Sequence, residues 1–391
     1  MSSAVVVGAG GFGGALAWWL ARTGTAVTLV DQFEPGDRRA TSGGESRLLR
    51  CSHGADAAYA ASARRARTLW RELEAECGEE LYVECGVTWF ARAEDGWEAA
   101  TMRVLAAQGI PFERLAPDEG NRLFPSWSSA GLAFLLHEPE AGVLRAQKAV
   151  RALARRAAAH GAAVVRSRAR PVGAAVRLGD GRTLEADAVV WACGAWLGRL
   201  FPELAPIAST RQELYFFAGG SAWAAPGVPA FVDYDHAVYG TADVDRLGVK
   251  AASDHDGPPL DPDAPLPTPG ADGEARVRAI LAERFPALAA APLAGAKSCR
   301  YELTPDGHFL AAPHPEHPSA WLLGGGSGHG FKHGPAIAER LAVALRGGAP
   351  MPARFGLCER APGRSVRTAG GSRSTVLREA RPASSAPGAR D

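Results

Sequence analysis

The sequence predicts an α/β protein in which a Rossmann-like nucleotide-binding domain is interleaved with a mixed-sheet α+β domain. Strand–turn–helix blocks occur at the start, the middle and the end of the chain, strand-rich segments separate them, and the first block carries a G-x-G-x-x-G turn. With 391 residues the chain is long enough for two packed domains. We expect the first domain to comprise 1–80, 141–210 and 296–358, and the second to comprise 81–140 and 211–295.

The amino-terminal block predicts a strand, a tight turn, a helix and a second strand. Val5–Val7 is a short β-branched run, which is typical of a buried parallel strand. The glycine-rich turn 8–14 leads into an alanine- and leucine-rich helix over 15–22, and Gly24 predicts its end. The second strand covers 26–30 and ends at Asp31.

The later helices and strands are predicted from hydrophobic periodicity, and their ends from the positions of glycine and proline. Helical spacing predicts helices at 60–77, 145–160, 274–285 and from Pro335 to about Leu345. Apolar runs predict strands at 86–91, 188–192, 214–217, 231–234, 237–239, 247–251 and 321–323. Gly179-Asp180-Gly181 predicts a hairpin between 172–178 and 182–184. The proline-rich stretch 258–270 predicts a loop, and 361–391 predicts a disordered tail.

Composition narrows the class of protein. The formal charge of +1 predicts neither a nucleic-acid nor a membrane partner, and no apolar run approaches the roughly 20 residues of a membrane span. No signal-like leader precedes the first strand. The six cysteines are scattered without a C-x-x-C pair, which favours reduced thiols in the cytoplasm. We expect a soluble cytoplasmic protein.

The glycine-rich turn predicts dinucleotide binding. Gly8, Gly10 and Gly13 lack the Cβ that would keep a phosphate from the backbone, and the following helix start offers N–H groups and a positive dipole end. Asp31, at the end of the second strand, can accept hydrogen bonds from ribose hydroxyls. A glycine-rich turn without a ligand is the alternative, and it leaves Asp31 unexplained.

The turn alone does not distinguish NAD from FAD, but a second glycine-rich loop favours FAD. Gly324–Gly330 follows a strand and precedes the helix at Pro335 near the other end of the chain. An elongated flavin dinucleotide needs backbone donors at both its pyrophosphate and its ring end. The two loops therefore predict that the first domain binds FAD and that the second is the substrate domain.

Several segments resemble the monomeric sarcosine oxidase and N-methyltryptophan oxidase branch of the D-amino-acid-oxidase-like flavoproteins. The resemblance runs from about residue 4 to residue 358. Besides the first glycine loop, it rests on the sequences GESRLLR (44–50), GAW (194–196), CRY (299–301), TPDGHF (304–309) and SGHGFK (327–332). The order and separation of the last motifs match the family as well as their residues do.

The resemblance implies a role for each matching residue. Cys299 would bond covalently to the flavin, Lys250 would promote reaction with oxygen, and Arg50 and Lys332 would clamp the substrate carboxylate. Arg47 would lie beside the flavin ring, and Tyr239 and Tyr301 would line the substrate pocket. The expected FAD-binding residues are Gly8, Gly10, Gly11, Phe12, Gly13, Asp31, Gly194, Cys299, Gly326, Gly328, Gly330, Phe331 and Lys332.

Each role has a simpler alternative. Cys299 could be a small buried hydrophobe, and Lys250 could lie at an exposed sheet edge. Arg50 and Lys332 could form ion pairs with nearby acids, and the two tyrosines could be half-buried aromatics. His314 and His317 are surrounded by prolines and have no evident ligand set, so we expect no metal site.

The chain departs from the family at the substrate pocket. Ser42 and Gly43 replace two adjacent histidines, and Asp254 stands where sarcosine oxidase has a histidine. The resemblance implies oxidation of a secondary or cyclic amino acid to an imine, with oxygen reduced to hydrogen peroxide, and these changes argue against sarcosine itself. A monomer that binds only small molecules is expected. A flavin dehydrogenase with another electron acceptor, and a non-catalytic flavin-binding accessory protein, are the alternatives.

Overall fold

The computed structural model describes residues 1–357 and residue 360. Its first sheet has six strands in the order β19-β20-β13-β1-β2-β9. All neighbours are parallel except the edge strand β19, which is antiparallel to β20. The strands are β1 (Ser3–Val7), β2 (Ala26–Asp31), β9 (Ala163–Arg166), β13 (Ala188–Trp191), β19 (Leu310–Pro313) and β20 (Ala320–Gly324).

Alternating residues of this sheet face two separate cores, as the two-residue period of a strand requires. Val6 and Leu29 face helices α1 (Gly11–Arg22), α4 (Ala146–Ala159), α8 (Gly334–Leu345) and α2 (Ala57–Cys77). Val5 and Trp191 face the opposite side, where β11 (Ala175–Leu178) and the short α5 (Leu197–Leu200) pack. The sheet is therefore covered on both faces, as a parallel sheet must be.

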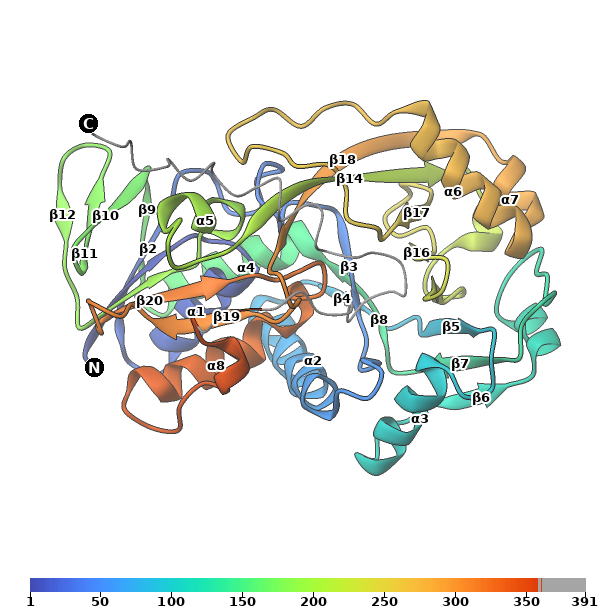
Figure 1. Cartoon of the computed structure of the whole chain (residues 1–391), viewed down its shortest axis with the longest axis horizontal. Helices are drawn as coiled ribbons and strands as arrows, with labels where there is room; N and C mark the ends of the chain where they lie inside the picture. The colour runs from blue at the N-terminus through green and yellow to red at the C-terminus, as the bar shows by residue number, and fades with distance from the viewer. Residues whose placement is uncertain (358–359, 361–391) are drawn as a thin grey trace, which may run out of the picture.

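The second sheet has eight strands in the order β18-β14-β17-β16-β15-β5-β7-β6. It is antiparallel except for the parallel pair β15 and β5, which confirms the predicted mixed sheet. Figure 1 shows β14 and β18 running side by side across the top of the molecule. The strands are β5 (Val87–Ala91), β6 (Glu113–Leu115), β7 (Phe134–Glu138), β14 (Ala208–Phe217), β15 (Ala230–Asp233), β16 (Val238–Thr241), β17 (Val249–Ser253) and β18 (Leu293–Leu303).

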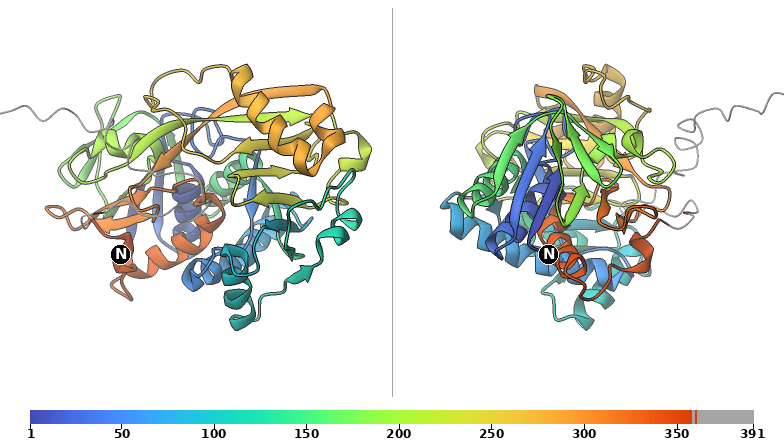
Figure 2. Two further views of the ribbon diagram at one scale, coloured as in Figure 1. Left: turned by 45° about the vertical axis from the view of Figure 1, so that its right-hand side comes forward. Right: turned by 90° about the vertical axis from the view of Figure 1, so that its left-hand side faces the viewer.

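Helices cover the second sheet. In Figure 2, α6 (Ala271–Arg284) and α7 (Pro286–Ala290) lie over this sheet, where α6 packs on β14 and β17, and α3 (Trp97–Ala107) packs on β5. Phe90, Phe124, Phe231 and Phe285 form an aromatic core between helix and sheet. This core packs α6 and α7 against the sheet.

Short elements complete the chain. Two small sheets have the orders β3-β8-β4 and β10-β11-β12. Among the described residues, none of the helices combines the length and apolarity needed to cross a bilayer. The short elements are β3 (Ser46–Leu49), β4 (Tyr82–Val83), β8 (Gly142–Arg145), β10 (Ala169–Val172), β12 (Thr183–Leu184), η1 (Pro117–Arg122), η2 (Gly194–Trp196), η3 (Ser221–Trp223), η4 (Phe331–His333) and η5 (Ala353–Phe355).

Most of the predicted helices and strands are present with ends shifted by a few residues, but helix α3 and several short strands, such as β7, β9 and β19, were not predicted. The single strand expected over 172–178 is wrong, because Gly173 adopts a φ of +59° and separates β10 from β11. Strand β18 was missed, because polar residues such as Lys297 and Ser298 interrupt its apolar pattern. The expected domain boundaries at 210 and 296 fall inside β14 and β18. The predicted disordered tail, 361–391, lies outside the described residues.

Candidate active site

The first glycine turn is built for close backbone approach. Gly8 has a φ of +109°, and a Cβ there would lie 2.2 Å from the carbonyl oxygen of Ala192 on the neighbouring strand. A Cβ on Gly13 would lie 1.9 Å from the carbonyl oxygen of Gly8. Helix α1 therefore packs directly against the strand end, and its first N–H groups face the space beyond β1.

Asp31 is held at the carboxyl end of β2 by backbone donors. Its Oδ2 accepts from the Ala9 N–H at 2.6 Å, and its Oδ1 accepts from the Phe33 N–H at 2.8 Å. Burial raises the pKa of the carboxyl, and these backbone N–H groups oppose that rise. Asp31 thus stabilises the turn through these hydrogen bonds, and it also lines the cavity that extends along the strand ends.

A cavity of about 710 Å³ extends along the carboxyl ends of the parallel strands. A cavity of this size is within the range of small-molecule and cofactor sites, and strand ends are where α/β folds bind them. Both glycine loops line it. The predicted site residues that line it are Gly8, Gly10, Gly11, Phe12, Asp31, Arg47, Gly194, Tyr301, Gly326, Gly328, Gly330 and Phe331. Those that do not are Gly13, Arg50, Tyr239, Lys250, Cys299 and Lys332.

The two glycine loops are in direct contact although they lie at opposite ends of the sequence. A Cβ on Gly11 would lie 2.9 Å from the Phe331 ring, and a Cβ on Gly330 would lie 2.9 Å from the Phe12 ring. The cavity reaches from Asp31 and Arg168 past both loops to Tyr301. A long ligand with a phosphate-bearing middle fits such a glycine-lined path, and the residues present therefore fit FAD.

Lys250 lies inside the second sheet. It sits on β17, which is flanked by β14 and β16, so the alternative of an exposed edge lysine is wrong. Its Nζ donates to Ser46 Oγ at 3.0 Å and to the Ser46 carbonyl at 3.2 Å. Burial, assisted by the charge of Arg47, lowers the pKa of Lys250 to about 7.

Cys299 lies on β18 and shares a small core with Tyr301 and Tyr239. The thiol is buried, and burial raises its pKa although Arg47 and Lys250 act in the opposite direction. Lys250 Nζ lies 5.2 Å from the centre of the Tyr239 ring. The fold therefore brings these five side chains together from three strands of the second sheet and from β3.

Arg47 and Tyr301 connect this group to the cavity. Arg47 donates to the carbonyls of Ser46 and Thr41, each at 2.8 Å, which holds its guanidinium at the cavity wall. The Tyr301 hydroxyl donates to Asp254 Oδ1 at 3.1 Å. Asp254 thereby belongs to the same buried group as the predicted pocket residues.

Arg50 and Lys332 are both buried. The guanidinium carbon of Arg50 lies 4.7 Å from the centre of the Trp89 ring. Lys332 Nζ donates to the His329 carbonyl at 2.9 Å, and the Trp70 indole N–H donates to the Lys332 carbonyl at 2.9 Å. Burial and then the charge of Arg50 hold the pKa of Lys332 well below its usual range. The two cations are close enough to influence each other.

Glu302 is a site residue that the sequence analysis did not identify. It follows Tyr301 on β18, lines the cavity, and accepts a hydrogen bond from the Gly326 N–H at 3.0 Å through Oε1. Its buried Oε2 has no hydrogen-bond partner within the described part of the chain. Burial raises the pKa of this carboxyl to about 7. Recognition of β18 as a strand would have placed Glu302 and Tyr301 on it.

A sequence profile described as FAD dependent oxidoreductase matches residues 3–344. The chain belongs to this family. The flavoprotein is 31% identical to a monomeric sarcosine oxidase of Streptomyces avermitilis over 364 residues, which are 88% of this chain and 93% of that protein. It is 30% identical to a monomeric sarcosine oxidase of a Bacillus species, covering 88% and 92% of the two chains. An N-methyl-L-tryptophan oxidase of Yersinia pestis is 26% identical, covering 87% and 93%.

Solved structures share the fold of the flavoprotein. An L-proline dehydrogenase from P. horikoshii superposes with a TM-score of 0.80 at 20% identity, covering 91% of this chain and 96% of the other. An iminodiacetate oxidase from Chelativorans sp. BNC1 superposes with a TM-score of 0.75 at 22% identity, covering 94% and 99%. The expected fold class, a Rossmann-like FAD-binding domain combined with a mixed sheet, is confirmed.

Proposed function

We propose that this flavoprotein oxidises a secondary or cyclic amino acid to an imine and reduces oxygen to hydrogen peroxide. The observation that carries the proposal is the convergence of Lys250, Arg47, Cys299 and two tyrosines where the FAD cavity meets the second sheet. The names of the sequence relatives, sarcosine oxidase and N-methyl-L-tryptophan oxidase, support the same reaction class. The reaction is balanced: two electrons and two protons leave the C–H and N–H of the amine, and the same number converts oxygen to hydrogen peroxide.

FAD would occupy the glycine-lined cavity. Gly8, Gly10 and the start of α1 would face its phosphates, Asp31 its ribose, and Gly326–Phe331 its ring end. When bound, the flavin supplies the redox chemistry, taking electrons from the C–H next to nitrogen and passing them to oxygen. Cys299, two residues before the cavity-lining Tyr301 on β18, is the proposed point of covalent attachment. Acid precipitation tests this: flavin colour that stays in the supernatant contradicts attachment, and peptide mass spectrometry locates a bond on Cys299.

Arg50 and Lys332 are proposed to bind the substrate carboxylate. Arg50 presents a planar fork of donors, Lys332 presents a compact ammonium group, and both are shielded from water. The substrate carboxylate would be held in a fixed orientation between these two cations, because water screens their attraction only weakly in a buried site. The amine would then point toward Tyr239 and Tyr301. The contact of Tyr301 with Asp254 places a carboxyl group in this wall, where sarcosine oxidase has the imidazole of a histidine.

Lys250 is proposed to hold a positive charge where oxygen is reduced. Its Nζ is fixed by Ser46, and its pKa of about 7 makes the protonated form available near neutral pH. A fixed cation stabilises negative charge that develops on oxygen.

The decisive experiment separates electron uptake from oxygen reduction. Anaerobic addition of N-methyl and cyclic amino acids should bleach the flavin of the wild-type protein, and bleaching by none of them would contradict the amine oxidase. In Lys250→Met, the rate of reoxidation by oxygen should fall by about 10²-fold or more, while anaerobic dye reduction should be retained. An unchanged oxygen rate would favour a dehydrogenase with another acceptor.

Cellular location and assembly belong to the same proposal. Cys51, Cys77, Cys85, Cys193 and Cys299 are all free thiols in the structure, which supports the reducing cytoplasm as the site of action. A monomer is proposed because FAD and substrate residues are all supplied by one chain. Sedimentation of the purified holoprotein tests this assignment.

A further inference from the structure

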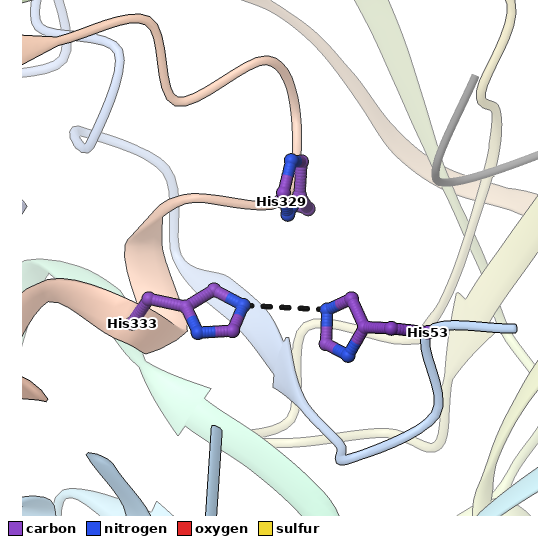
Figure 3. A group of neighbouring side chains, drawn as sticks. All are labelled: His53, His329 and His333. Atoms are coloured by element: carbon purple, nitrogen blue, oxygen red, sulfur yellow. Dashed lines mark hydrogen bonds between the residues drawn. The ribbon is translucent and has the colours of Figure 1, made fainter. Parts of the chain in front are cut away.

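Three buried histidines converge near the two residues of the proposed carboxylate clamp. His53 lies in the loop after β3, His329 lies in the second glycine loop, and His333 ends η4 (Figure 3). Their exposures are 4%, 4% and 0%, and each offers a ligand atom within 4.8 Å of those of the other two. The sequence analysis considered only the pair His314 and His317 and expected no metal.

We propose that His53, His329 and His333 form a binding site for a transition-metal dication of the zinc, nickel or copper class. Imidazole nitrogen suits these metals, and three protein ligands with one open position is a common zinc arrangement. His53 Nε2 and His333 Nε2 lie 3.3 Å apart. Two nitrogens bound at about 2.0–2.1 Å to a tetrahedral zinc are separated by roughly this distance.

The contacts around the rings are those that orient metal-binding histidines. His53 Nδ1 lies 3.0 Å from the Cys51 carbonyl, and His329 Nε2 lies 3.0 Å from the Gly307 carbonyl. A carbonyl only accepts, so each of these nitrogens carries the ring proton and the other nitrogen of the ring carries a lone pair. This pattern, with one ring nitrogen donating to a fixed acceptor, is what supports a ligand histidine from outside the metal site.

His333 needs only a change of tautomer to complete the set. Its Nδ1 lies 3.0 Å from Ser62 Oγ, which can donate or accept. Without metal, His333 Nε2–H donates to His53 Nε2, and Ser62 donates to His333 Nδ1. With metal, the proton of His333 moves to Nδ1, Ser62 accepts it, and both Nε2 lone pairs face the ion.

Charges near the site limit which ions it can hold. Arg50 and Lys332 lie close enough to act on His53, and Glu138 acts on Lys332 with the opposite sign. The two cations repel any dication at this site. Magnesium and calcium prefer oxygen ligands, which the three histidines do not offer, so neither ion would bind here. Only a metal with strong affinity for imidazole would overcome this opposition.

The position of the site would let the metal link two separate segments of the chain. His53 belongs to the loop that carries Arg50, and His329 and His333 flank Lys332 in sequence. A bound ion would therefore join the two segments that supply the carboxylate clamp. The metal would hold the clamp together.

The test uses the flavin-loaded protein after treatment with a chelator. Titration with Co²⁺ should give one ion per chain, with d–d absorption in the red, where flavin does not absorb, and Zn²⁺ should displace it. Zinc should also raise the melting temperature. Each of His53→Gln, His329→Gln and His333→Gln should weaken binding about 100-fold, and Ser62→Ala about 10-fold. The matched control, His314→Gln with His317→Gln, should bind as the wild type does.

Three results would overturn the site. One is wild-type protein that takes up no Co²⁺ and shows no zinc-dependent shift in melting temperature. Another is binding that is lost in the His314 and His317 control but retained in His53→Gln. The third is binding that all three single variants retain, since the histidines would then be only a hydrogen-bonded core. Each variant is first checked for its flavin spectrum, and because binding is measured without turnover, failure here is separate from failure of the proposed oxidase activity.

Discussion

At the scale of single residues, burial decides the chemistry of the site. Lys250, Cys299 and Glu302 are all buried. Burial lowers the pKa of Lys250 and raises the pKa of Cys299 and of Glu302, so it favours the neutral form of each. For Lys250 and Glu302 the result is a pKa of about 7, near the pH of a cell. Small changes in surroundings can therefore switch the charge of these two groups.

Reoxidation by oxygen should depend on the charge of Lys250. Its pKa is about 7, so the ammonium form dominates below this pH and is lost above it. We expect the rate constant of the reduced protein with oxygen to fall up to tenfold for each pH unit above 7. Lys250→Arg keeps a charge at all these pH values and should remove the dependence. Stopped-flow measurement from pH 5.5 to 9 checks this, and a wild-type rate that rises with pH contradicts it.

Glu302 should make stability depend on pH. Its folded pKa of about 7 lies above the usual value of 4.5, so the folded state binds more protons between these values, and stability falls as pH rises through this window. The loss is on the order of 3 kcal/mol at most. Glu302→Gln should lose much less free energy of unfolding between pH 5 and 8, as measured by urea denaturation. The exposed Glu316→Gln serves as control and should follow the wild type.

At the scale of elements, two strand–turn–helix units place the cofactor, and one long antiparallel pair places the chemistry. Strands β14 and β18 pair over nearly their whole length, with Cys299 opposite Gln212 and Tyr301 opposite Thr210. Strand β17 then sets Lys250 opposite Phe216 of β14. The register of these three strands therefore fixes the spacing of the proposed catalytic group.

The glycine turn offers a matched pair of substitutions. Gly8 and Gly24 both have positive φ, at +109° and +84°, but only at Gly8 would a Cβ meet a neighbour, the Ala192 carbonyl at 2.2 Å. Gly8→Ala should lose flavin, because the turn must move away from the cofactor path. Gly24→Ala should cost only about 1 kcal/mol and keep the flavin. Absorbance spectra and thermal melts of both variants check this. A flavin-loaded Gly8→Ala would contradict it.

At the scale of the whole molecule, the two sheets share the cofactor cavity. Tyr301 and Glu302 of the eight-stranded sheet line the same cavity as Gly8 and Gly10, which follow β1 of the six-stranded sheet. Lys297 of β18 also forms an ion pair with Glu45, the residue before β3. Neither sheet can lose its structure without opening the site.

We therefore expect the molecule to unfold in a single cooperative transition. Flavin fluorescence, which reports the cavity, and far-ultraviolet circular dichroism, which reports the sheets and helices, should change at the same temperature. Melting the holoprotein with both probes checks this. A change in flavin fluorescence several degrees before the loss of secondary structure would show that one sheet unfolds alone.

The cofactor-binding loops of the candidate site could be predicted from the sequence, whereas Glu302 and the three buried histidines could not. The residues of both glycine loops and Asp31 were predicted from local spacing, and the structure places all of them except Gly13 and Lys332 along one cavity. Glu302 was missed because its strand does not alternate cleanly between polar and apolar residues. The three histidines were missed because His53 is far in sequence from His329 and His333, and no local pattern joins them.

The sequence by itself determined the glycine turns, the buried parallel strands and the amphipathic helices, because each depends on residues a few positions apart. Only the tertiary structure decided that Lys250 is interior, that Glu302 faces the cavity, and that His53 lies beside His329 and His333. These facts depend on strand register and on contacts between distant segments. Burial, which sets the pKa of each group, is a property of the assembled fold and not of any short stretch of chain.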